Sequence, residues 1–509
     1  MAGELLQGIE QAVRWDTMLL LAVGTIVGDL AAAIPGLSAI QAIALLLPFT
    51  AYLSPVGALA LLVGIYKGGC FGGSTTAILL ATPGTAEASA TVLDGYPMAR
   101  QGMAGKALRI ALWSSVTADL FAALVLIFGA AVLAPYALKI GPPEYFALVV
   151  CALTIIGLVG QASPARSAVA VGLGFLLATV GQDPVHGAVR FDIGVLALTS
   201  GIPLVPMIIG LLAIPELLDQ FGKRHRSVSV EQMRAFLRDP EKQRFTLAEY
   251  RRCLPTMLRS SAVGAVIGAL PGLGGAIAAF VSYGVARRLS KHPERFGKGE
   301  MEGLAAAEAG DSATVGPTLI PLLTLGIPGS GTAALFIPAF LLHGVQVGPR
   351  VFADHGPVVY GLFALFVIGT AVHAVVGIGI RAAAARILAV PPNLLYPAVL
   401  LMTLVGAYTA ETSLVAVGVA LFFGGLGMVM RRFGFPPIPL LIAFVLGGLT
   451  ETALGQSLLL FDNRLSGFLE RPLALAFFAL AAGIALVAAR GAWQGARSRE
   501  RRPAADQRA

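Results

Sequence analysis

Charged residues are scarce in this sequence. Only 13% of its 509 residues are Asp, Glu, Lys or Arg, about half of the roughly 25% that is usual in soluble proteins. Hydrophobic residues make up 56%, and the mean hydropathy is +0.80. So few charges cannot cover a water-facing surface of this size, and most of the exterior is therefore expected to face lipid. This composition excludes disordered chains and nucleic-acid-binding proteins, and it indicates an all-α polytopic membrane protein.

Metal-site and hydrolase motifs are also lacking. The three cysteines, Cys70, Cys151 and Cys253, lie far apart without CxxC spacing, which predicts neither a disulfide framework nor a metal centre. The sequence contains no HExxH or GxSxG motif, and its six His are scattered. An intramembrane enzyme, such as a protease or lipid transferase, remains an alternative. It is disfavoured because no nucleophile with a base and no second intramembrane Asp matching Asp311 can be found.

Two hydrophilic segments carry much of the positive charge. The insert 222–259 has ten Lys and Arg against four Asp and Glu, and the tail 490–509 has six Arg against two acidic residues. The positive-inside rule places both in the cytoplasm, and we expect the insert to be a short amphipathic helical linker. Apolar stretches long enough to cross a membrane are expected near 17–53 (interrupted), 58–80, 110–135, 145–162, 167–181, 194–215, 260–286 (interrupted), 303–325, 357–380, 395–410, 413–430, 437–450 and 473–489.

Proline and glycine signatures recur in the same order in two halves of the chain. The first member of each pair lies 236, 245, 249 or 246 residues before the second. The pairs are PGLS 35–38 with PGLG 271–274, TPGT 82–85 with IPGS 327–330, PP 142–143 with PP 391–392, and AVGL 170–173 with AVGV 416–419.

The loops that connect the spans of these halves differ in charge. Each basic loop of one half corresponds to a less basic loop of the other; Arg100–Arg109, for example, corresponds to Gly344–Gly356. This pattern predicts an inverted-topology repeat with two broken-helix or re-entrant Pro-Gly hairpins. The predicted organisation is a first repeat at 1–221, a basic cytoplasmic linker at 222–259, a second repeat at 260–471, and a final helix with a cytoplasmic tail at 472–509.

The broken helices indicate where a ligand would bind. Inverted repeats with discontinuous helices are typical of secondary transporters, whose substrate sites lie near the bilayer midplane. A helix that begins just after Pro-Gly has unpaired N–H groups at the positive end of its dipole, and these groups can bind a carboxylate. A simple kink whose hydroxyl groups bond to the preceding turn is the alternative. The predicted substrate-binding residues are Ser74, Thr75, Thr82, Pro83, Gly84, Thr85, Thr324, Pro328, Gly329, Ser330 and Thr332.

Lys67 and Asp311 are ionisable residues in apolar regions. Such residues are costly within a membrane and usually have a partner or a function. Lys67 lies 16 residues before Pro83, and Ser312 lies 16 residues before Pro328, so Tyr66-Lys67 and Asp311-Ser312 occupy equivalent positions. We hypothesise that Lys67 and Asp311 form a salt bridge or a proton-linked pair. Snorkelling of Lys67 and helix capping by Asp311 is the alternative. Asp119 and His373, also in apolar spans, are interpreted as packing residues.

At these motifs the sequence resembles the large membrane subunit of the bacterial tripartite tricarboxylate transporters. The resemblance covers nearly the whole chain, and it rests on GGCFGGS 68–74, TPGT 82–85, DGYPMA 94–99, FGKG 296–299 with EG 302–303, and LTLGIPGS 323–330.

The resemblance implies an inner-membrane, Na⁺- or H⁺-coupled importer of carboxylates that uses no other cofactor. It also implies a small four-helix membrane subunit and a periplasmic substrate-binding protein as partners. The two Pro-Gly hairpins would be the substrate-binding tips of an elevator-type domain. The sequence departs from the family at Asp311-Ser312, where members usually carry Asn-Asn, and at Lys67, where they usually carry a neutral residue. These changes put the usual substrate or coupling ion in doubt.

Overall fold

The computed structural model describes residues 2–34, 37–158, 163–221, 241–387 and 392–500. Pro35, Gly36, Pro391 and the insert up to residue 240 lie outside the described residues. The described chain is mostly helical, in agreement with the all-α part of the predicted fold class, and its strands form one short hairpin. It divides into two compact units, unit 1 (Met1–Leu138 and Pro203–Val429) and unit 2 (Lys139–Ile202 and Met430–Ala509).

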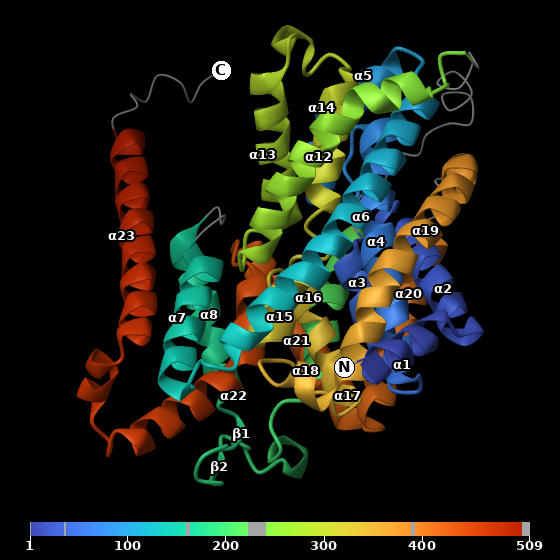
Figure 1. Ribbon diagram of the computed structural model, residues 1–509. Helices are drawn as coiled ribbons and strands as arrows, with labels where there is room; N and C mark the ends of the chain where they lie inside the picture. The colour runs from blue at the N-terminus through green and yellow to red at the C-terminus, as the bar shows by residue number, and fades with distance from the viewer. Residues whose placement is uncertain (1, 35–36, 159–162, 222–240, 388–391, 501–509) are drawn as a thin grey trace. The chain divides into compact units, whose positions relative to one another are not determined.

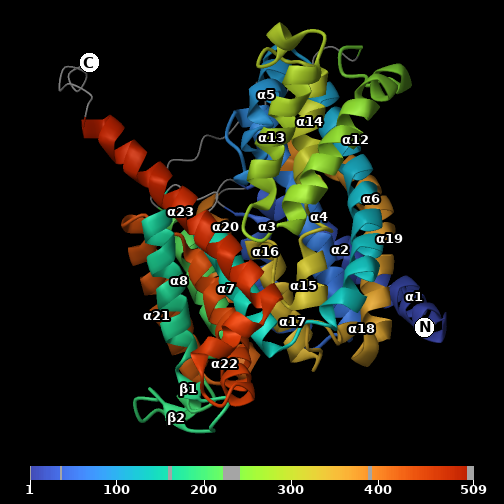
Figure 2. The same cartoon turned by 60° about the vertical axis from the view of Figure 1, so that its left-hand side comes forward.

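Unit 1 holds both predicted Pro-Gly tips. Its helix α4 is buried along its whole length and packs against α2, α6 and α19 (Figure 1). Helices α12, α13 and α14 pack against one another (Figure 2). The elements are α1 Ala2–Val13, α2 Trp15–Ala32, α3 Ala39–Thr50, α4 Pro55–Leu80, η1 Glu87–Ser89, α5 Val92–Arg100, α6 Ala104–Ala137, α9 Leu204–Ile208, η3 Ile209–Ala213, α10 Ile214–Phe221, α12 Leu247–Ala269, α13 Gly274–Leu289, η4 Pro293–Arg295, α14 Met301–Ser312, α15 Leu319–Leu325, α16 Gly331–Ala334, α17 Phe336–Leu342, α18 Val351–Asp354, α19 Gly356–Ile387, α20 Pro392–Glu411 and α21 Leu414–Arg432.

Unit 2 is a smaller helical body with a hairpin. Helix α22 packs against α7 and α8, and α23 packs against α7. The hairpin strands are antiparallel, with Gly181 opposite Arg190. The elements are α7 Pro142–Leu158, α8 Pro164–Ala178, β1 Gly181–Gln182, β2 Val189–Arg190, η2 Leu196–Leu198, α22 Pro437–Leu460, η5 Leu465–Glu470 and α23 Pro472–Glu500.

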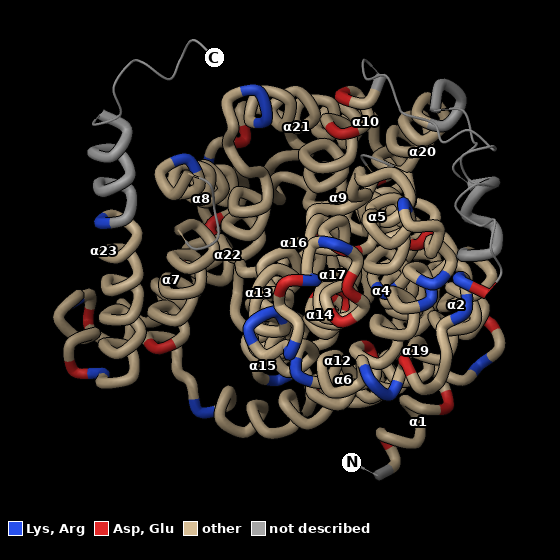
Figure 3. Tube along the Cα trace, turned by 90° about the horizontal axis from the view of Figure 1, so that it is seen from above, with Lys and Arg blue, Asp and Glu red and all other residues tan. Residues whose placement is uncertain are grey.

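Seven described helices, α2, α4, α6, α19, α21, α22 and α23, are long and apolar enough to span a membrane. Other predicted spans correspond to shorter apolar helices, including α3, α7 and α8. Charged residues occupy short stretches of an otherwise uncharged trace (Figure 3). These features define a multi-pass membrane protein, as the composition predicts.

Two details of the predicted segmentation are wrong. The expected span 194–215 contains only the single 3₁₀ turn η2 before Leu204, where the continuous helix begins. Gly194 and Gly201 take positive φ angles of 74° and 98°, which interrupt a helix, and Pro203 precedes α9. The expected span 303–325 is broken between α14 and α15. In addition, α12 begins at Leu247, inside the predicted linker, with Thr246 and Glu249 forming a capping box at its N-terminus.

Small residues allow α2 and α4 to pack closely. A methyl group on Gly28 of α2 would overlap the carbonyl oxygen of Ile65 in α4, and a methyl group on Gly68 of α4 would overlap that of Thr25. This is the small-residue packing typical of membrane helices. This close packing explains why α4 has so many glycines. The GxxxG spacing alone is weak evidence for such packing in a sequence with 61 Gly.

The same contact occurs between α12 and α14. There Gly264 faces the carbonyl oxygen of Gly310. Gly264 follows Gly28 by 236 positions, and Gly310 follows Ile65 by 245, which are the offsets of the first two motif pairs in the sequence. The α2–α4 and α12–α14 pairs therefore share a local packing arrangement, and each pair leads into a Pro-Gly tip.

Candidate functional site

The first tip is the turn that comes after α4. Ala81 takes the left-handed conformation (φ 54°) and ends the helix after Leu80. The chain then folds back onto α4, so that the N–H of Gly84 donates to the carbonyl oxygen of Gly73 at 3.3 Å. The hydroxyl oxygen of Thr85 accepts a hydrogen bond from the N–H of Ala88 at 3.3 Å.

The second tip has the same hydrogen bonds. Gly326 is left-handed (φ 71°) and ends α15. The N–H of Gly329 donates to the carbonyl oxygen of Thr318 at 3.1 Å. The hydroxyl of Ser330 caps α16 by accepting from the N–H of Ala333 at 3.1 Å. Each of these residues follows its counterpart in the first tip by 245 positions, so the duplication in the sequence extends to individual hydrogen bonds.

The two tips differ in the element that begins after the Pro-Gly turn. In the second tip α16 begins at Gly331, directly after Pro-Gly-Ser, as predicted. In the first tip the chain continues as the single 3₁₀ turn η1, and α5 begins only at Val92. The expectation of a helix that begins just after the first Pro-Gly is therefore wrong. Because Thr85 caps a single turn there, an aligned helix dipole is lacking at that position.

A glycine is required in each tip because backbone approaches it closely. A methyl group on Gly84 would overlap the carbonyl oxygen of Ala32, at the end of α2. A methyl group on Gly329 would lie 2.8 Å from the carbonyl oxygen of Gly268, at the end of α12. In the second half the N–H of Gly272 also donates to the carbonyl oxygen of Gly329 at 3.0 Å. The first tip thus packs against the end of α2, and the second tip packs against the end of α12. Each of these helices is followed by the other Pro-Gly motif of the same half.

The remaining predicted hydroxyl residues fall into two groups. Ser74, Thr82 and Thr324 donate to carbonyl oxygens of their own chain segment: Cys70 (3.4 Å), Leu80 (3.4 Å) and Ile320 (2.7 Å). For Thr82 and Thr324 this is the arrangement expected of hydroxyls that only satisfy a kink, whereas the hydroxyl of Ser74 also hydrogen-bonds to Glu308. Thr75 and Ser312 are different, since their hydroxyl oxygens are buried without a hydrogen-bond partner. Thr332 and Ser330 are buried, whereas Thr82 is exposed and Pro83 half-buried.

Tyr66 connects α4 to the second tip. Its hydroxyl lies 3.3 Å from the hydroxyl oxygen of Ser330 and 3.5 Å from that of Thr318. Among the described residues no hydrogen bond joins the two tips directly. The sequence pairs Tyr66 with Asp311 by position, but it does not predict that Tyr66 contacts Ser330.

Lys67 does not pair with Asp311. Its ammonium nitrogen lies 3.2 Å from the Oδ2 atom of Asp119 and donates to the hydroxyl of Thr370 at 3.2 Å. The ring of Phe366 lies beneath it, with its centroid 5.4 Å away. Lys67 thus faces α6 and α19, whereas the neighbouring Tyr66 faces the second tip, because adjacent residues of a helix point in different directions. The hypothesised Lys67–Asp311 pair is therefore corrected to Lys67–Asp119.

Asp119 has a second partner on α19. The Nδ1 atom of His373 lies 2.8 Å from the same Oδ2 atom of Asp119. All three side chains are buried: Lys67 and His373 are 0% exposed, and Asp119 is 1% exposed. We call these three residues with Thr370 the Lys67 cluster. Asp119 and His373 are therefore members of a buried polar cluster and not only packing residues. The signal in the sequence that could have indicated this is the placement of Thr370 and His373 on one face of a helix, as positions i and i+3.

Asp311 lies among other acidic residues. It interacts electrostatically with Glu87, Glu308 and Asp119. Glu308 accepts hydrogen bonds from the hydroxyl of Thr91 and, at 3.4 Å, from that of Ser115. Among the described residues no group of three or more His, Cys, Asp or Glu side chains has the arrangement of a metal site.

Asp29 is a further buried acid, which sequence reasoning overlooked. Its side chain is 0% exposed, and both carboxylate oxygens lack a hydrogen-bond partner. It lies on α2, where its backbone carbonyl oxygen lies close to Gly72 of α4. Its position in an apolar span, six residues before Pro35, is the signal that could have identified it.

Asp94 explains why the DGYP and FGKG motifs occur together. Its Oδ1 atom accepts hydrogen bonds from the N–H groups of Gly299 (2.7 Å) and Glu300 (2.9 Å), and its Oδ2 atom accepts one from the hydroxyl of Tyr283 (2.9 Å). The carboxylate therefore ties α5 to α13 and to the turn before α14. These motifs have a structural role in holding the two halves of unit 1 together.

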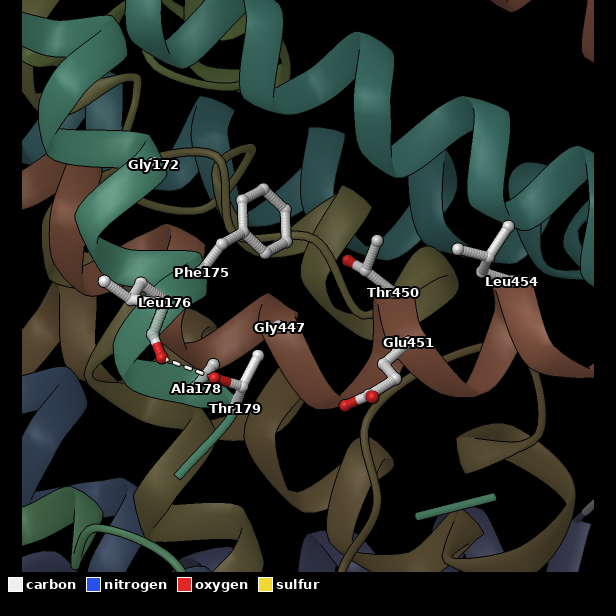
Figure 4. A pocket seen from close by; sticks show the side chains of 9 residues that line it. All are labelled: Gly172, Phe175, Leu176, Ala178, Thr179, Gly447, Thr450, Glu451 and Leu454. Carbon is white, nitrogen blue, oxygen red and sulfur yellow. Dashed lines mark hydrogen bonds between the residues drawn. The ribbon is translucent and has the colours of Figure 1, made fainter. Parts of the chain in front are cut away.

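Unit 2 has a cleft of about 440 Å³ between α8 and α22 (Figure 4). Phe175, Leu176 and Leu454 give it a largely apolar lining, and the carboxylate of Glu451 is held by Arg190 at 2.8 and 3.0 Å. In the adjacent hairpin, hydrogen bonds from the backbone N–H of Val185, and then from the side chain of His186, lower the pKa of Asp183. No residue predicted to bind substrate lines this cleft.

The helices, their buried polar groups and the paired breaks define a multi-pass membrane protein with a duplicated Pro-Gly core. Residues 18–442 match the Tripartite tricarboxylate transporter TctA family, and the chain belongs to this family of transporters. The resemblance inferred from the motifs is thereby confirmed. The family name implies that partner subunits assemble with the chain.

Two curated proteins of Agrobacterium vitis are similar to this chain. An uncharacterized 52.8 kDa protein in the TAR-I ttuC′ 3′ region is 36% identical over 94% of each chain. An uncharacterized protein in the TAR-II ttuC′ 3′ region is 34% identical over 43% of this chain and 90% of that protein. No solved structure matches the sequence.

Proposed function

We propose that this protein is the substrate-translocating subunit of a secondary active importer of tri- or dicarboxylates. Its family is a transporter family, and both Pro-Gly tips lie in unit 1. The observation that carries the proposal is the pair of equivalent, hydroxyl-capped turns at Thr85 and Ser330. Turns of this kind present hydroxyl and amide groups suited to a carboxylate, without a buried Arg.

The substrate site in this proposal consists of the two tips. It uses the predicted residues at 82–85 and 328–332 together with the unpartnered hydroxyl of Thr75. In the second tip, the N-terminus of α16 supplies further N–H groups. The two halves would act as an inverted repeat, with the tips moving in an elevator-type cycle. The repeated hydrogen bonds support the duplication on which this mechanism depends.

Import of such anions requires coupling. Moving a trianion inward against ~100 mV, negative inside, costs about 7 kcal/mol, because each charge contributes about 2.3 kcal/mol. Capture by a binding protein cannot supply this energy, since an equilibrium does not depend on the route. Co-transported Na⁺ or H⁺ would therefore drive uptake.

The cellular arrangement is part of the same proposal. The protein would lie in the bacterial inner membrane with its basic C-terminal tail in the cytoplasm. A periplasmic binding protein would deliver substrate, and a small four-helix membrane subunit would complete the transporter. The family name supports partner subunits in general. That these partners are a periplasmic binding protein and a four-helix membrane subunit is part of the proposal.

Uptake of labelled citrate, dicarboxylates and aromatic acids by cells that express the chain with and without its partner subunits tests the proposal. We expect at least one carboxylate to accumulate only when all subunits are present, and accumulation to cease when a protonophore is added or Na⁺ is removed. Full accumulation under both treatments would contradict the coupling, and no uptake of any carboxylate would contradict the function.

A further inference from the structure

We propose that the Lys67 cluster is the proton-binding site of this transporter and that His373 takes up the proton at Nε2. The proposal rests on the proposed carboxylate import, and it identifies the coupling ion and the residues that bind it. The site lies where α4, α6 and α19 meet, within unit 1. It uses none of the residues assigned to the substrate tips.

The hydrogen bonds of the cluster leave one nitrogen available for a proton. A single oxygen of Asp119, Oδ2, lies 3.2 Å from the ammonium nitrogen of Lys67 and 2.8 Å from Nδ1 of His373. If Nδ1 of His373 carries the proton that faces Asp119, then Nε2 of the neutral ring is an acceptor. Nε2 is buried and has no hydrogen-bond partner. A second proton can therefore bind without breaking a hydrogen bond of the cluster.

Whether His373 binds a second proton depends on the charges around the cluster. With a neutral His373, the charges of Lys67 and Asp119 cancel. Protonation of His373 gives the buried cluster a net positive charge, which is costly in a low-dielectric interior unless a negative charge lies nearby. The proton is therefore expected to bind when an anion approaches and to leave when that anion departs.

Several ionisable groups surround the cluster from the neighbouring helices. Asp311 of α14 interacts electrostatically with Asp119. Glu87 and Glu308 in turn interact electrostatically with Asp311. On α4 itself Cys70 interacts with Lys67, and α2, which packs against α19, carries the buried Asp29. Each carboxyl group among them favours an added positive charge only when it is ionised.

Helix α4 connects this site to the second tip. Tyr66 contacts Ser330, and Lys67, the next residue, contacts Asp119. One turn further along, the ring of Phe71 lies 6.1 Å from that of His373. A carboxylate at the tip would add negative charge, which favours protonation of His373. By thermodynamic reciprocity, the proton would also strengthen carboxylate binding.

Gly369 shows that α19 is shaped around the cluster. A methyl group at Gly369 would lie 3.3 Å from Cδ and 3.4 Å from Cε of Lys67. The absence of a side chain there lets the Lys67 stem pass between α4 and α19 to reach Asp119. Gly369 thus allows the ammonium group of Lys67 to reach Asp119, which is also paired with His373.

Transport by reconstituted vesicles that contain the chain and its partner subunits tests the proposal. Vesicles with an interior of pH 7.5 are diluted into Na⁺-free medium of pH 6.0, and uptake of a labelled carboxylate (citrate first, then the other acids of the panel) is measured. Counterflow exchange at equal pH is measured in parallel, because exchange needs binding and movement but no net proton flux.

The principal variant is His373→Asn, whose amide can donate to Asp119 as Nδ1 does but cannot take up a proton. We expect the pH gradient to stimulate wild-type uptake about tenfold and the variant less than about twofold, with counterflow retained. His292→Gln, at an exposed His that pairs with Glu294, is the matched control and should behave as wild type. Asp119→Asn, which removes the central anion, is the second variant and should also lose the stimulation.

Each outcome decides between the proposals. Stimulation that persists in a folded His373→Asn or Asp119→Asn protein overturns the proton site, as does wild-type uptake that requires Na⁺ and ignores the pH gradient. Both of these results leave carboxylate import intact. Failure of the wild-type vesicles to take up or exchange any carboxylate overturns the proposed function and, with it, this inference.

Discussion

Breaking the Lys67–Asp119 ion pair from either side should give unequal losses of stability. At 3.2 Å and an effective dielectric constant of about 20, the two charges attract each other by about 5 kcal/mol. Removing one partner of a buried pair usually costs about 3–5 kcal/mol, because the remaining charge is left uncompensated. Both side chains are at most 1% exposed, so water cannot replace the lost partner.

The asymmetry arises from His373. In Lys67→Met, Asp119 retains His373, which can become protonated and provide the missing positive charge. In Asp119→Asn, Lys67 retains only neutral contacts with Thr370 and Phe366, since no second carboxylate among the described residues forms an ion pair with it. We therefore expect Asp119→Asn to be the more destabilising change.

A double-mutant cycle measures the coupling. Lys67→Met with Asp119→Asn leaves no unpaired charge, and it should be more stable than Asp119→Asn alone, by about 2 kcal/mol or more. The assay is thermal unfolding of the purified variants in one detergent at pH 7, with the fraction of monodisperse protein as the readout. Equal losses for the two single variants, or additive losses in the double variant, would refute the reasoning.

Three further predictions concern other parts of the molecule. Gly84→Ala and Gly329→Ala should each cost about 1–3 kcal/mol through overpacking, whereas Gly418→Ala, with open space at its Cβ position, should change stability by less than about 0.5 kcal/mol; equal melting temperatures would contradict this. Asp94→Asn should destabilise the purified protein by about 2 kcal/mol or more because it weakens charge-assisted hydrogen bonds, and an unchanged melting temperature would count against the assigned role. The pKa of Asp183 is lowered in the folded hairpin, so the Asp183 carboxylate stabilises the hairpin above the unfolded pKa of about 3.9, and this stabilisation is lost as the pH falls through the lower folded pKa. Acid-protease cleavage of 181–202 should therefore rise below about pH 4 in the wild type. An equal rise in Asp183→Asn would contradict this prediction.

The spans and the duplication could be predicted because they depend on local composition. Long apolar runs without charge indicate membrane helices, and the Pro-Gly motifs recur at offsets that the structure repeats in the hydrogen bonds of Gly84 and Gly329. The wrong span at 194–215 shows the limit of this reasoning. Hydropathy alone suggests a helix there, but the positive φ angles of Gly194 and Gly201 are decided by the folded loop.

The partners of buried charges could not be predicted in the same way. Positional equivalence places Tyr66-Lys67 opposite Asp311-Ser312, but a repeat relation does not determine which helix a side chain faces. Lys67 faces α6 and α19, and its partner Asp119 lies 52 positions away in the sequence with no motif to connect the two. Such pairs depend on the packing of three helices, which the sequence pattern does not encode locally.

In the proposed function the two hydroxyl-capped tips bind the carboxylate together. Its most direct test is the concentration dependence of carboxylate uptake for Thr85→Ala and Ser330→Ala at matched amounts of membrane-inserted protein. Thr452→Ala, whose hydroxyl donates only to the carbonyl oxygen of Gly448, is the control. We expect both tip variants to raise the KM about tenfold or more and the control to leave it unchanged. A KM that is unchanged in both tip variants would contradict this expectation.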